Sequence, residues 1–173
     1  IYDVNKEYFS WVPEKNLYAL SSLNQGAGQV RTNGRFAFTV NYVQVAQKIR
    51  SILDQITNAR IINNDKYELL GADTEIHMIF SVCGGTGCGT LLNMAYLIRK
   101  EAPGCKLTGY AVLPDVFKSM SNSGMAKVAP NAYGAIQDLD YLMHMGIGST
   151  PVKLEYIRDS YEIKERPFNS VVF

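Results

Sequence analysis

Four glycines fall within six residues near the middle of the chain, in the segment Cys83-Gly84-Gly85-Thr86-Gly87-Cys88-Gly89-Thr90. An apolar run at residues 76–82 precedes this segment, and residues 91–101 have a helical composition. A turn from a strand into a helix leaves backbone N–H groups free where the helix dipole favours an anion. Because glycine has no Cβ, several amides can converge on one such group. The segment therefore predicts a phosphate site, with the hydroxyls of Thr86 and Thr90 as further candidate donors.

Two known phosphate loops each differ from this segment at one position. A Walker A loop has lysine after its last glycine, and Thr90 stands where that lysine should be. A dinucleotide fingerprint is Gly-x-Gly-x-x-Gly, whereas Gly85, Gly87 and Gly89 follow Gly-x-Gly-x-Gly. The structural alternative is a tight turn without a ligand. Such a turn needs about one or two glycines, and further ones cost backbone entropy, so we favour the phosphate site.

The elements around the turn predict an α/β fold. Apolar residues at three- and four-residue spacing predict two helices, from about 35 to 56 and from about 130 to 145. A polar loop at 114–127 is expected between the strand at 107–113 and the second of these helices. Weak alternation predicts a hairpin within 152–163. Short apolar runs predict three strands, at residues 76–82, 107–113 and 168–173. This order predicts a parallel sheet with right-handed crossovers and helices on both faces, a three-layer α/β/α arrangement of Rossmann-like type.

The composition excludes several classes of protein. The 173 residues include 47% hydrophobic residues, and 17 Lys+Arg balance 16 Asp+Glu. This hydrophobic content argues against disorder and for one domain, and the near-neutral charge argues against nucleic-acid or membrane-surface binding. We see no signal peptide or membrane span. Cys83, Cys88 and Cys105 lack Cys-x-x-Cys spacing, which argues against a zinc site or a disulfide framework and favours the cytoplasm.

The cysteines beside the glycine turn have a second possible role. A helix N-terminus can lower the pKa of a thiol and make it nucleophilic. Cys83 and Cys88 flank the expected helix start, but the sequence shows no base beside them. We therefore assign no catalytic residue to the chain.

The glycine segment resembles the phosphate loop of the tubulin/FtsZ family of GTPases, Gly-Gly-Thr-Gly-Ser/Thr-Gly. Residues 84–89 match it, with Cys88 replacing the usual hydroxyl residue. Gly26-Ala27-Gly28 is similar to the upstream phosphate-contacting loop, and Ala111-Val112-Leu113-Pro114-Asp115 to the next strand and its sugar-side loop. Pro130-Asn131-Ala132-Tyr133-Gly134-Ala135 opens a helix much as in bacterial tubulin-like proteins. The resemblance covers about residues 24–145 and extends to a following strand at 168–173.

This resemblance implies a tubulin/FtsZ-like topology that binds GTP or GDP with Mg²⁺. It also implies self-assembly into a head-to-tail homo-oligomer or filament, in which an acidic loop of the next subunit completes hydrolysis. The implied nucleotide-binding residues are Gly26, Ala27, Gly28, Gly84, Gly85, Thr86, Gly87, Cys88, Gly89, Pro114 and Asp115.

Several parts of such a GTPase are not found in residues 1–173. By the resemblance, a first glycine-rich loop lies before Ile1, and the guanine-reading asparagine and the water-activating acidic loop lie after Phe173. We therefore expect a partial nucleotide-binding domain from a longer protein, and expect the chain alone not to hydrolyse GTP at a family-typical rate. One alternative is a non-hydrolysing tubulin-like scaffold. Another is an NAD-type domain with Asp115 at the ribose, which the glycine spacing disfavours.

Overall fold

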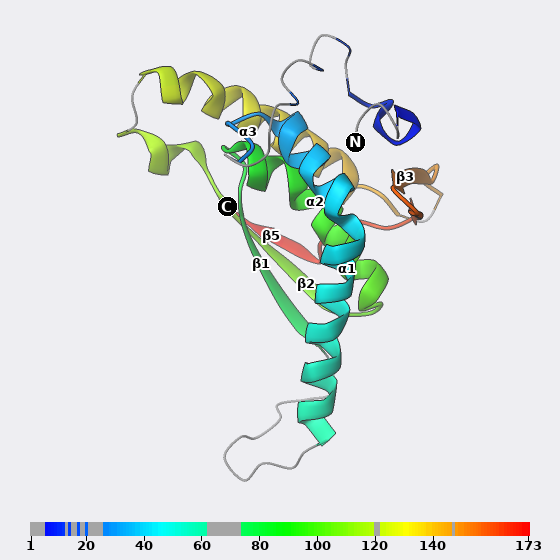
Figure 1. The fold of residues 1–173 in the computed structure, drawn as a ribbon. Helices are drawn as coiled ribbons and strands as arrows, with labels where there is room; N and C mark the ends of the chain where they lie inside the picture. The colour runs from blue at the N-terminus through cyan, green and yellow to red at the C-terminus, as the bar shows by residue number, and fades with distance from the viewer. Residues whose placement is uncertain are drawn as a thin grey trace.

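The computed structural model describes residues 6–12, 14, 17, 20, 26–61, 74–119, 122–146 and 148–173, with side chains at 57–61 and 122–124 left aside. The elements run in the order η1 (Lys6–Phe9), α1 (Arg31–Ile61), β1 (Glu75–Ser81), α2 (Gly85–Glu101), β2 (Lys106–Val112), η4 (Pro114–Phe117), α3 (Asn122–Met143), β3 (Val152–Tyr156), β4 (Asp159–Ile163) and β5 (Ser170–Val172). Figure 1 shows this arrangement. Among these described residues, no helix is long and apolar enough to cross a membrane.

The main sheet is parallel, which confirms the expected fold class. Its strand order is β1-β2-β5, and the pairing of β1 with β2 runs from Glu75 opposite Lys106 to Ser81 opposite Val112. β2 pairs with β5 in the same direction. The carboxyl ends of β1 and β2 therefore lie at one edge of the sheet, where ligands bind in open α/β folds. The expected hairpin is also present, because β3 and β4 pair antiparallel.

The main core lies between this sheet and helices α2 and α3. Buried side chains from all three meet there, including Phe80, Leu107 and Leu91. Gly109 leaves room for two aromatic rings, since a Cβ at that position would lie 3.0 Å from Phe80 and 3.1 Å from Phe168. Burying a large apolar side chain contributes about 1.5–3 kcal/mol, so this cluster fixes α2 on the sheet.

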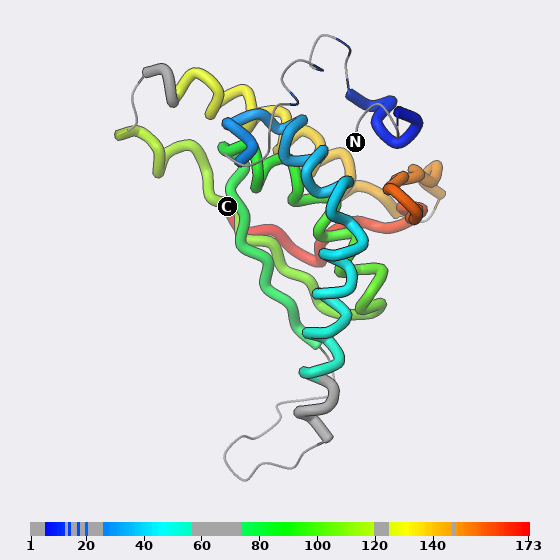
Figure 2. Tube along the Cα trace, in the orientation of Figure 1, coloured from blue at the N-terminus to red at the C-terminus, as the bar shows by residue number. Residues whose placement is uncertain are grey.

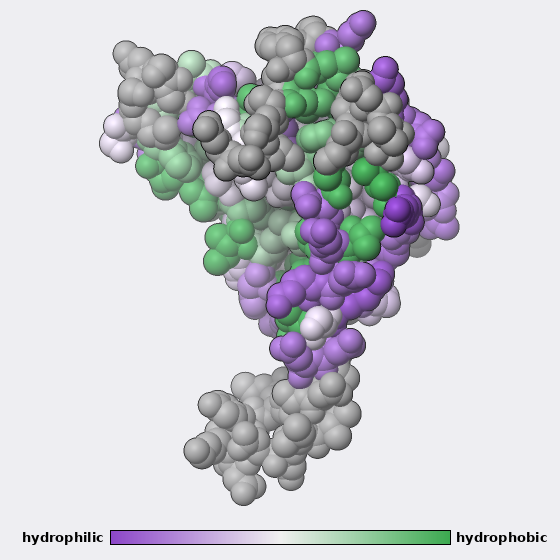
Figure 3. Space-filling model, in the orientation of Figure 1, coloured by the Kyte–Doolittle hydropathy of each residue, from purple (hydrophilic) through white to green (hydrophobic). Residues whose placement is uncertain are grey.

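Helix α1 packs on α2 rather than on the sheet, as Figures 1 and 2 show. The two helices approach closely where glycines face each other. A Cβ on Gly34 would meet the carbonyl of Gly85, and a Cβ on Gly89 would meet the carbonyl of Arg31. Much of the outward surface of α1 is hydrophilic (Figure 3). The amphipathic prediction is confirmed only in part, because the apolar side chains of Val43, Ile52 and Ile56 are exposed.

The opposite face of the sheet is open among the residues that the structure describes. Ile79 points away from the helices and is 76% exposed, because side chains alternate between the two faces of a strand. The helices packed on the sheet, α2 and α3, lie on one face, and the second helical layer that we expected is not formed by described residues.

The expected polar loop at 114–127 is wrong in part. A short 3-10 helix occupies Pro114–Phe117, and α3 begins at Asn122 and continues through Pro130. A proline inside a helix removes one backbone hydrogen bond. Val128 and Ala132 are both buried in the core on either side of it, so packing of the apolar face carries the helix across the proline.

Candidate functional site

Most of the glycine segment belongs to the first turn of helix α2 and not to a loop. α2 already begins at Gly85, with Gly84 as its N-cap in an extended conformation (φ −92°, ψ 169°). No side chain of the described residues caps this helix end. The first N–H groups of a helix have no partner within it, and they carry the positive end of the helix dipole. The start of α2 therefore offers a set of backbone donors to an anion.

Three of the four glycines have a packing reason of their own. A Cβ on Gly85 would lie 2.6 Å from the backbone N of Val30, and one on Gly87 would lie 2.6 Å from the carbonyl of Ser81. Gly89 faces the backbone of α1. Gly84 differs, because a Cβ there would meet no atom within 4 Å. The number of glycines thus reflects close backbone approach as well as a possible ligand, and Gly84 alone faces open space.

The upstream loop lies against the start of α2. Gly26 and Gly28 have φ values of 81° and 56°, in the left-handed region that favours glycine. The carbonyl of Ala27 accepts hydrogen bonds from the backbone N of Val30 (3.0 Å) and from Nδ2 of Asn33 (3.3 Å). These bonds close the loop into a tight turn beside Gly85. The structure therefore brings together the candidate residues of the upstream loop and of the glycine turn.

Asn131 on α3 links these two segments, and the sequence reasoning assigned it no role. Its Nδ2 donates to the carbonyls of Gln29 and Cys83, both at 3.0 Å. The residue is 8% exposed, and buried amides that bond two loops hold them in register. A polar asparagine among the buried positions Val128 and Ala132 is the sequence signal that could have identified it.

The side chains of the turn divide into inward and outward ones. Thr86 is exposed, and its hydroxyl has no hydrogen-bond partner among the described residues. The hydroxyl of Thr90 instead donates to the carbonyl of Thr86 (2.9 Å), and the thiol of Cys88 donates to the carbonyl of Asn131 (3.2 Å). Thr86 therefore remains a candidate phosphate donor, whereas the Thr90 and Cys88 side chains are used within the protein.

The cysteines are not poised for nucleophilic chemistry. Burial raises the pKa of the Cys88 thiol to about 11 and also raises that of Cys83. A thiol that stays protonated at neutral pH is a poor nucleophile. Burial thus outweighs the helix dipole here, and both side chains serve as small core residues.

Pro114 and Asp115 follow β2 at the same sheet edge as the glycine turn. The carboxylate of Asp115 pairs with Nζ of Lys118 at 2.5 Å, and this hydrogen bond lowers the pKa of Asp115. Both side chains are largely exposed. No contact among the described residues joins Asp115 to the glycine turn, so the structure places it at the correct edge without bringing it to the helix start.

The described residues offer no cluster of three or more His, Cys, Asp or Glu side chains that would hold a metal ion. Mg²⁺ commonly keeps several waters and binds through substrate phosphates with one or two carboxylates. The exposed hydroxyl of Thr86 and the phosphate oxygens are the donor types that suit it here. The described residues are therefore compatible with a magnesium ion that arrives with a nucleotide, and they form no metal-binding cage of their own.

The parallel sheet, whose first strand leads through a glycine turn into a helix, has a Rossmann-like arrangement. Comparison with known families agrees with this class. The family model described as "Tubulin like" matches residues 3–172, and the chain belongs to that family. Neither the curated proteins nor the solved structures include a significant match to this chain.

Proposed function

We propose that this chain binds GTP at the start of α2, as part of a tubulin-like GTPase domain that assembles head to tail. The observation that carries the proposal is the uncapped helix start at Gly84, which faces open space. Family membership supports the choice of nucleotide. Binding a phosphate there would satisfy backbone donors that the fold itself leaves without a side-chain partner.

Each group of residues at the proposed site has a separate role in nucleotide binding. Amides at the start of α2 hold phosphate oxygens, and the Thr86 hydroxyl adds a donor from the exposed side. The upstream loop at 26–28 lies beside Gly85 and contributes further backbone groups. Asn131 and Asn33 keep both segments in place without touching the ligand. Pro114 and Asp115 lie toward the sugar.

A magnesium ion bound with the nucleotide would neutralise phosphate charge during phosphoryl transfer. In this proposal the described residues position the phosphates, and none of them is assigned to activate water. Asp115 is paired with Lys118, and Asp138 is paired with Arg31. A general base must lie within about 2.6–3.2 Å of the proton that it takes. No described carboxylate is assigned to that position at the turn. Hydrolysis would therefore require a general base from a neighbouring subunit.

Calorimetric titration of the chain with GTP, GDP, ATP and NAD tests the binding proposal. We expect GTP and GDP to bind and NAD not to bind. Discrimination between GTP and ATP should be weak, because none of the residues assigned to this site reads the base. Absence of binding by any nucleoside triphosphate would contradict the proposed site, and tight NAD binding would favour the dinucleotide alternative.

Phosphate release in the presence of Mg²⁺, measured at several protein concentrations, separates the GTPase from the scaffold. We expect the chain alone to bind GTP without turnover at any concentration. Turnover restored by a longer tubulin-like chain that carries the acidic loop would support the GTPase. Turnover by the chain alone that disappears in Asp115→Ala would instead show that Asp115 activates water.

A further inference from the structure

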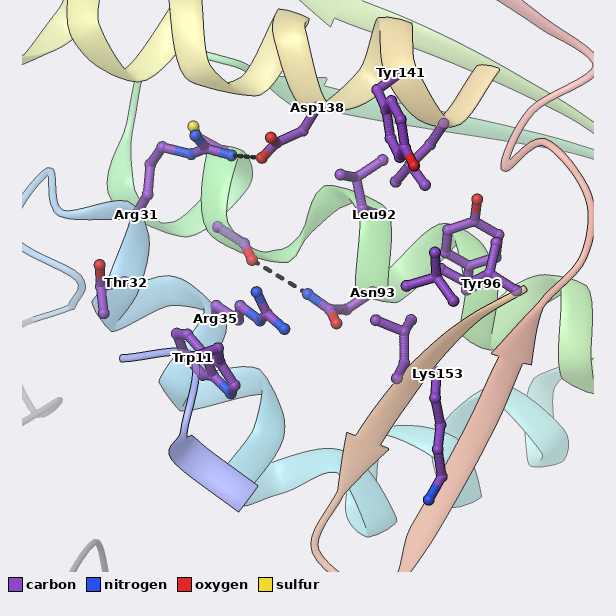
Figure 4. Close-up of a pocket in the computed structure, with 16 residues that line it drawn as sticks. Trp11, Arg31, Thr32, Arg35, Leu92, Asn93, Tyr96, Asp138, Tyr141 and Lys153 are labelled. Carbon is purple, nitrogen blue, oxygen red and sulfur yellow. Dashed lines mark hydrogen bonds and ion pairs between the residues drawn. The ribbon is translucent and has the colours of Figure 1, made fainter. Parts of the chain in front are cut away.

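A cavity of about 550 Å³ lies on the flank of α2, away from Gly84 and Thr86. Its walls come from Trp11, the start of α1, the middle of α2, the end of α3 and the β3–β4 hairpin (Figure 4). Pockets for small organic ligands typically measure 300–1,000 Å³ and have mainly apolar walls with a few polar groups. The cavity has this size and this character, and neither Gly84 nor Thr86 lines it.

Several charged and amide groups that line the cavity already have partners. Arg31 pairs with Asp138, and Lys153 pairs with Glu155 at 2.7 Å. Asn93 donates to Gly89 and accepts from the hydroxyl of Tyr156. The guanidinium of Arg35, by contrast, has no hydrogen bond or ion pair among the described residues.

Arg35 is held in a defined position. Its guanidinium carbon lies 4.1 Å from the centre of the Trp11 ring, and Figure 4 shows the side chain pointing between Trp11 and Asn93. Burial lowers the pKa of Arg35 from its high usual value, a sign that its charge is poorly solvated. The buried Nε of Arg31, beside it in the cavity wall, is also without a partner among the described residues. An unpaired charge in such surroundings is unfavourable until an anion neutralises it.

The remaining walls suit an apolar body attached to that anion. Leu92 and Leu142 line the cavity together with Tyr141, which is 65% exposed, and with apolar residues of the hairpin. A guanidinium stacked on a ring keeps its N–H edge free for a planar acceptor, and a carboxylate matches that edge with two parallel hydrogen bonds. The other cations of the wall are already paired, which favours a single negative charge over a phosphate dianion.

We propose that this cavity binds a small organic carboxylate with an aromatic or aliphatic body, whose carboxylate pairs with Arg35. Neither Gly84 nor Thr86 lines the cavity, but its wall includes Cys88 and Gly89 of the same turn and Arg31 of α1. These residues belong to the helices that carry the two phosphate-contacting segments. Occupation of the cavity would fix the contact between α1 and α2 close to the nucleotide.

Trp11 provides an internal probe, because it is the only tryptophan of the chain and lies against Arg35. We would titrate the whole chain with phenylbutyrate and with its neutral amide, under selective excitation of tryptophan. The carboxylate should change the tryptophan emission until the signal saturates. The amide should bind at least about tenfold more weakly, because the free energy of a hydrogen bond to a charged group corresponds to a tenfold change in affinity or more. No change with the carboxylate, or equal binding of both compounds, would overturn the proposal.

Three variants locate the binding. Arg35→Gln should weaken carboxylate binding roughly ten- to hundredfold and leave amide binding unchanged. Tyr141→Ala removes a largely exposed side chain from the cavity wall, so this variant should fold normally. It should weaken the binding of both compounds. Arg166→Gln removes an exposed arginine outside the cavity and should have no effect. Carboxylate binding retained in a folded Arg35→Gln variant would overturn the assignment, as would equal losses in Arg35→Gln and Arg166→Gln.

Discussion

The glycine turn and the cavity on the flank of α2 recognise ligands in different ways. The turn offers backbone amides, and its glycines let main chains approach closely. The cavity offers side chains from five separate segments, and Arg35 is a cation in its wall without an ion pair among the described residues. A backbone site leaves a dense local pattern in the sequence, whereas a side-chain cavity is formed only when distant segments fold together. This difference explains why one site was visible in the sequence and the other was not.

The turn itself contains a second contrast, between Gly84 and its neighbours. Gly85, Gly87 and Gly89 have backbone atoms in the space that a Cβ would need, whereas Gly84 has none. The first three are therefore required by packing, and only Gly84 can report on a ligand without a change in the fold. The predictions below use this contrast, from the largest expected effect to the smallest.

Gly85→Val should have the largest effect. The new Cβ would lie 2.6 Å from the backbone N of Val30 and 2.8 Å from Cβ of Ala27, and the backbone must move to admit it. We expect a loss of at least about 3 kcal/mol in the free energy of unfolding, measured by urea denaturation, and a loss of GTP binding that follows from it. Full stability in this variant would show that the upstream loop does not lie against α2.

Asn131→Ala tests the link between the two segments. It removes the amide that bonds the carbonyls of Gln29 and Cys83 and leaves both without this donor. We expect a loss of about 2 kcal/mol in unfolding free energy and a several-fold loss in GTP affinity. Asn41→Ala is the matched control, because that amide is exposed and bonds only within α1. Equal effects of the two substitutions would argue against a special role for Asn131.

Cys88→Ser restores the hydroxyl residue that the tubulin/FtsZ signature has at this position. Because the Cys88 side chain is buried and donates to the carbonyl of Asn131, serine should keep that bond and lose apolar contact. We expect a loss of about 1 kcal/mol in unfolding free energy and an unchanged GTP affinity. A clear gain in GTP affinity by calorimetry would show instead that this side chain reaches the phosphates.

The smallest effect concerns the β3–β4 wall of the cavity and depends on pH. Asp159 bonds to Lys100, which joins the hairpin to α2. Burial raises the pKa of this carboxyl, but hydrogen bonds from Lys100, the Ser160 amide and Tyr42 outweigh it and lower the pKa overall. The stabilisation is therefore present above the unfolded-state pKa of about 3.9 and disappears as the pH falls below it.

We expect the wild type to exceed Asp159→Asn in unfolding free energy by less than about 1 kcal/mol at neutral pH, since the pair is partly exposed. This difference in unfolding free energy should shrink towards zero as the pH falls below the unfolded-state pKa of Asp159. A difference that stays constant with pH would mean that the carboxylate charge does not hold the hairpin.

The sequence was sufficient for much of the fold. Runs of apolar residues identified β1 and β2, three- and four-residue spacing identified α1, and the βαβ order implied the parallel sheet. It was insufficient where tertiary packing overrides a local signal. Pro130 suggested a helix start, but buried neighbours on both sides extend α3 back to Asn122.

The candidate site shows the same limit. Local pattern placed the glycine turn and the upstream loop, which lie together in the structure. It did not show that Cys88 and Thr90 turn their polar atoms towards the protein, because a helix start at Gly85 rather than near residue 91 sets their directions. The local sequence pattern also did not reveal the roles of Asn131 and Arg35. These roles depend on partners more than twenty residues away in the chain.

The central claim is that the start of α2 binds the phosphates of GTP, and Gly84→Ala tests it most directly. The backbone at Gly84 is extended, with φ −92° and ψ 169°, and nothing lies within 4 Å of a Cβ there. Alanine should therefore leave the unfolding free energy unchanged or raise it by up to about 1 kcal/mol. Calorimetric titration of GTP into the wild type and this variant should show at least about a tenfold loss of affinity, because the methyl group occupies the open space where the phosphate would lie. An unchanged GTP affinity in a fully stable Gly84→Ala variant would contradict the claim.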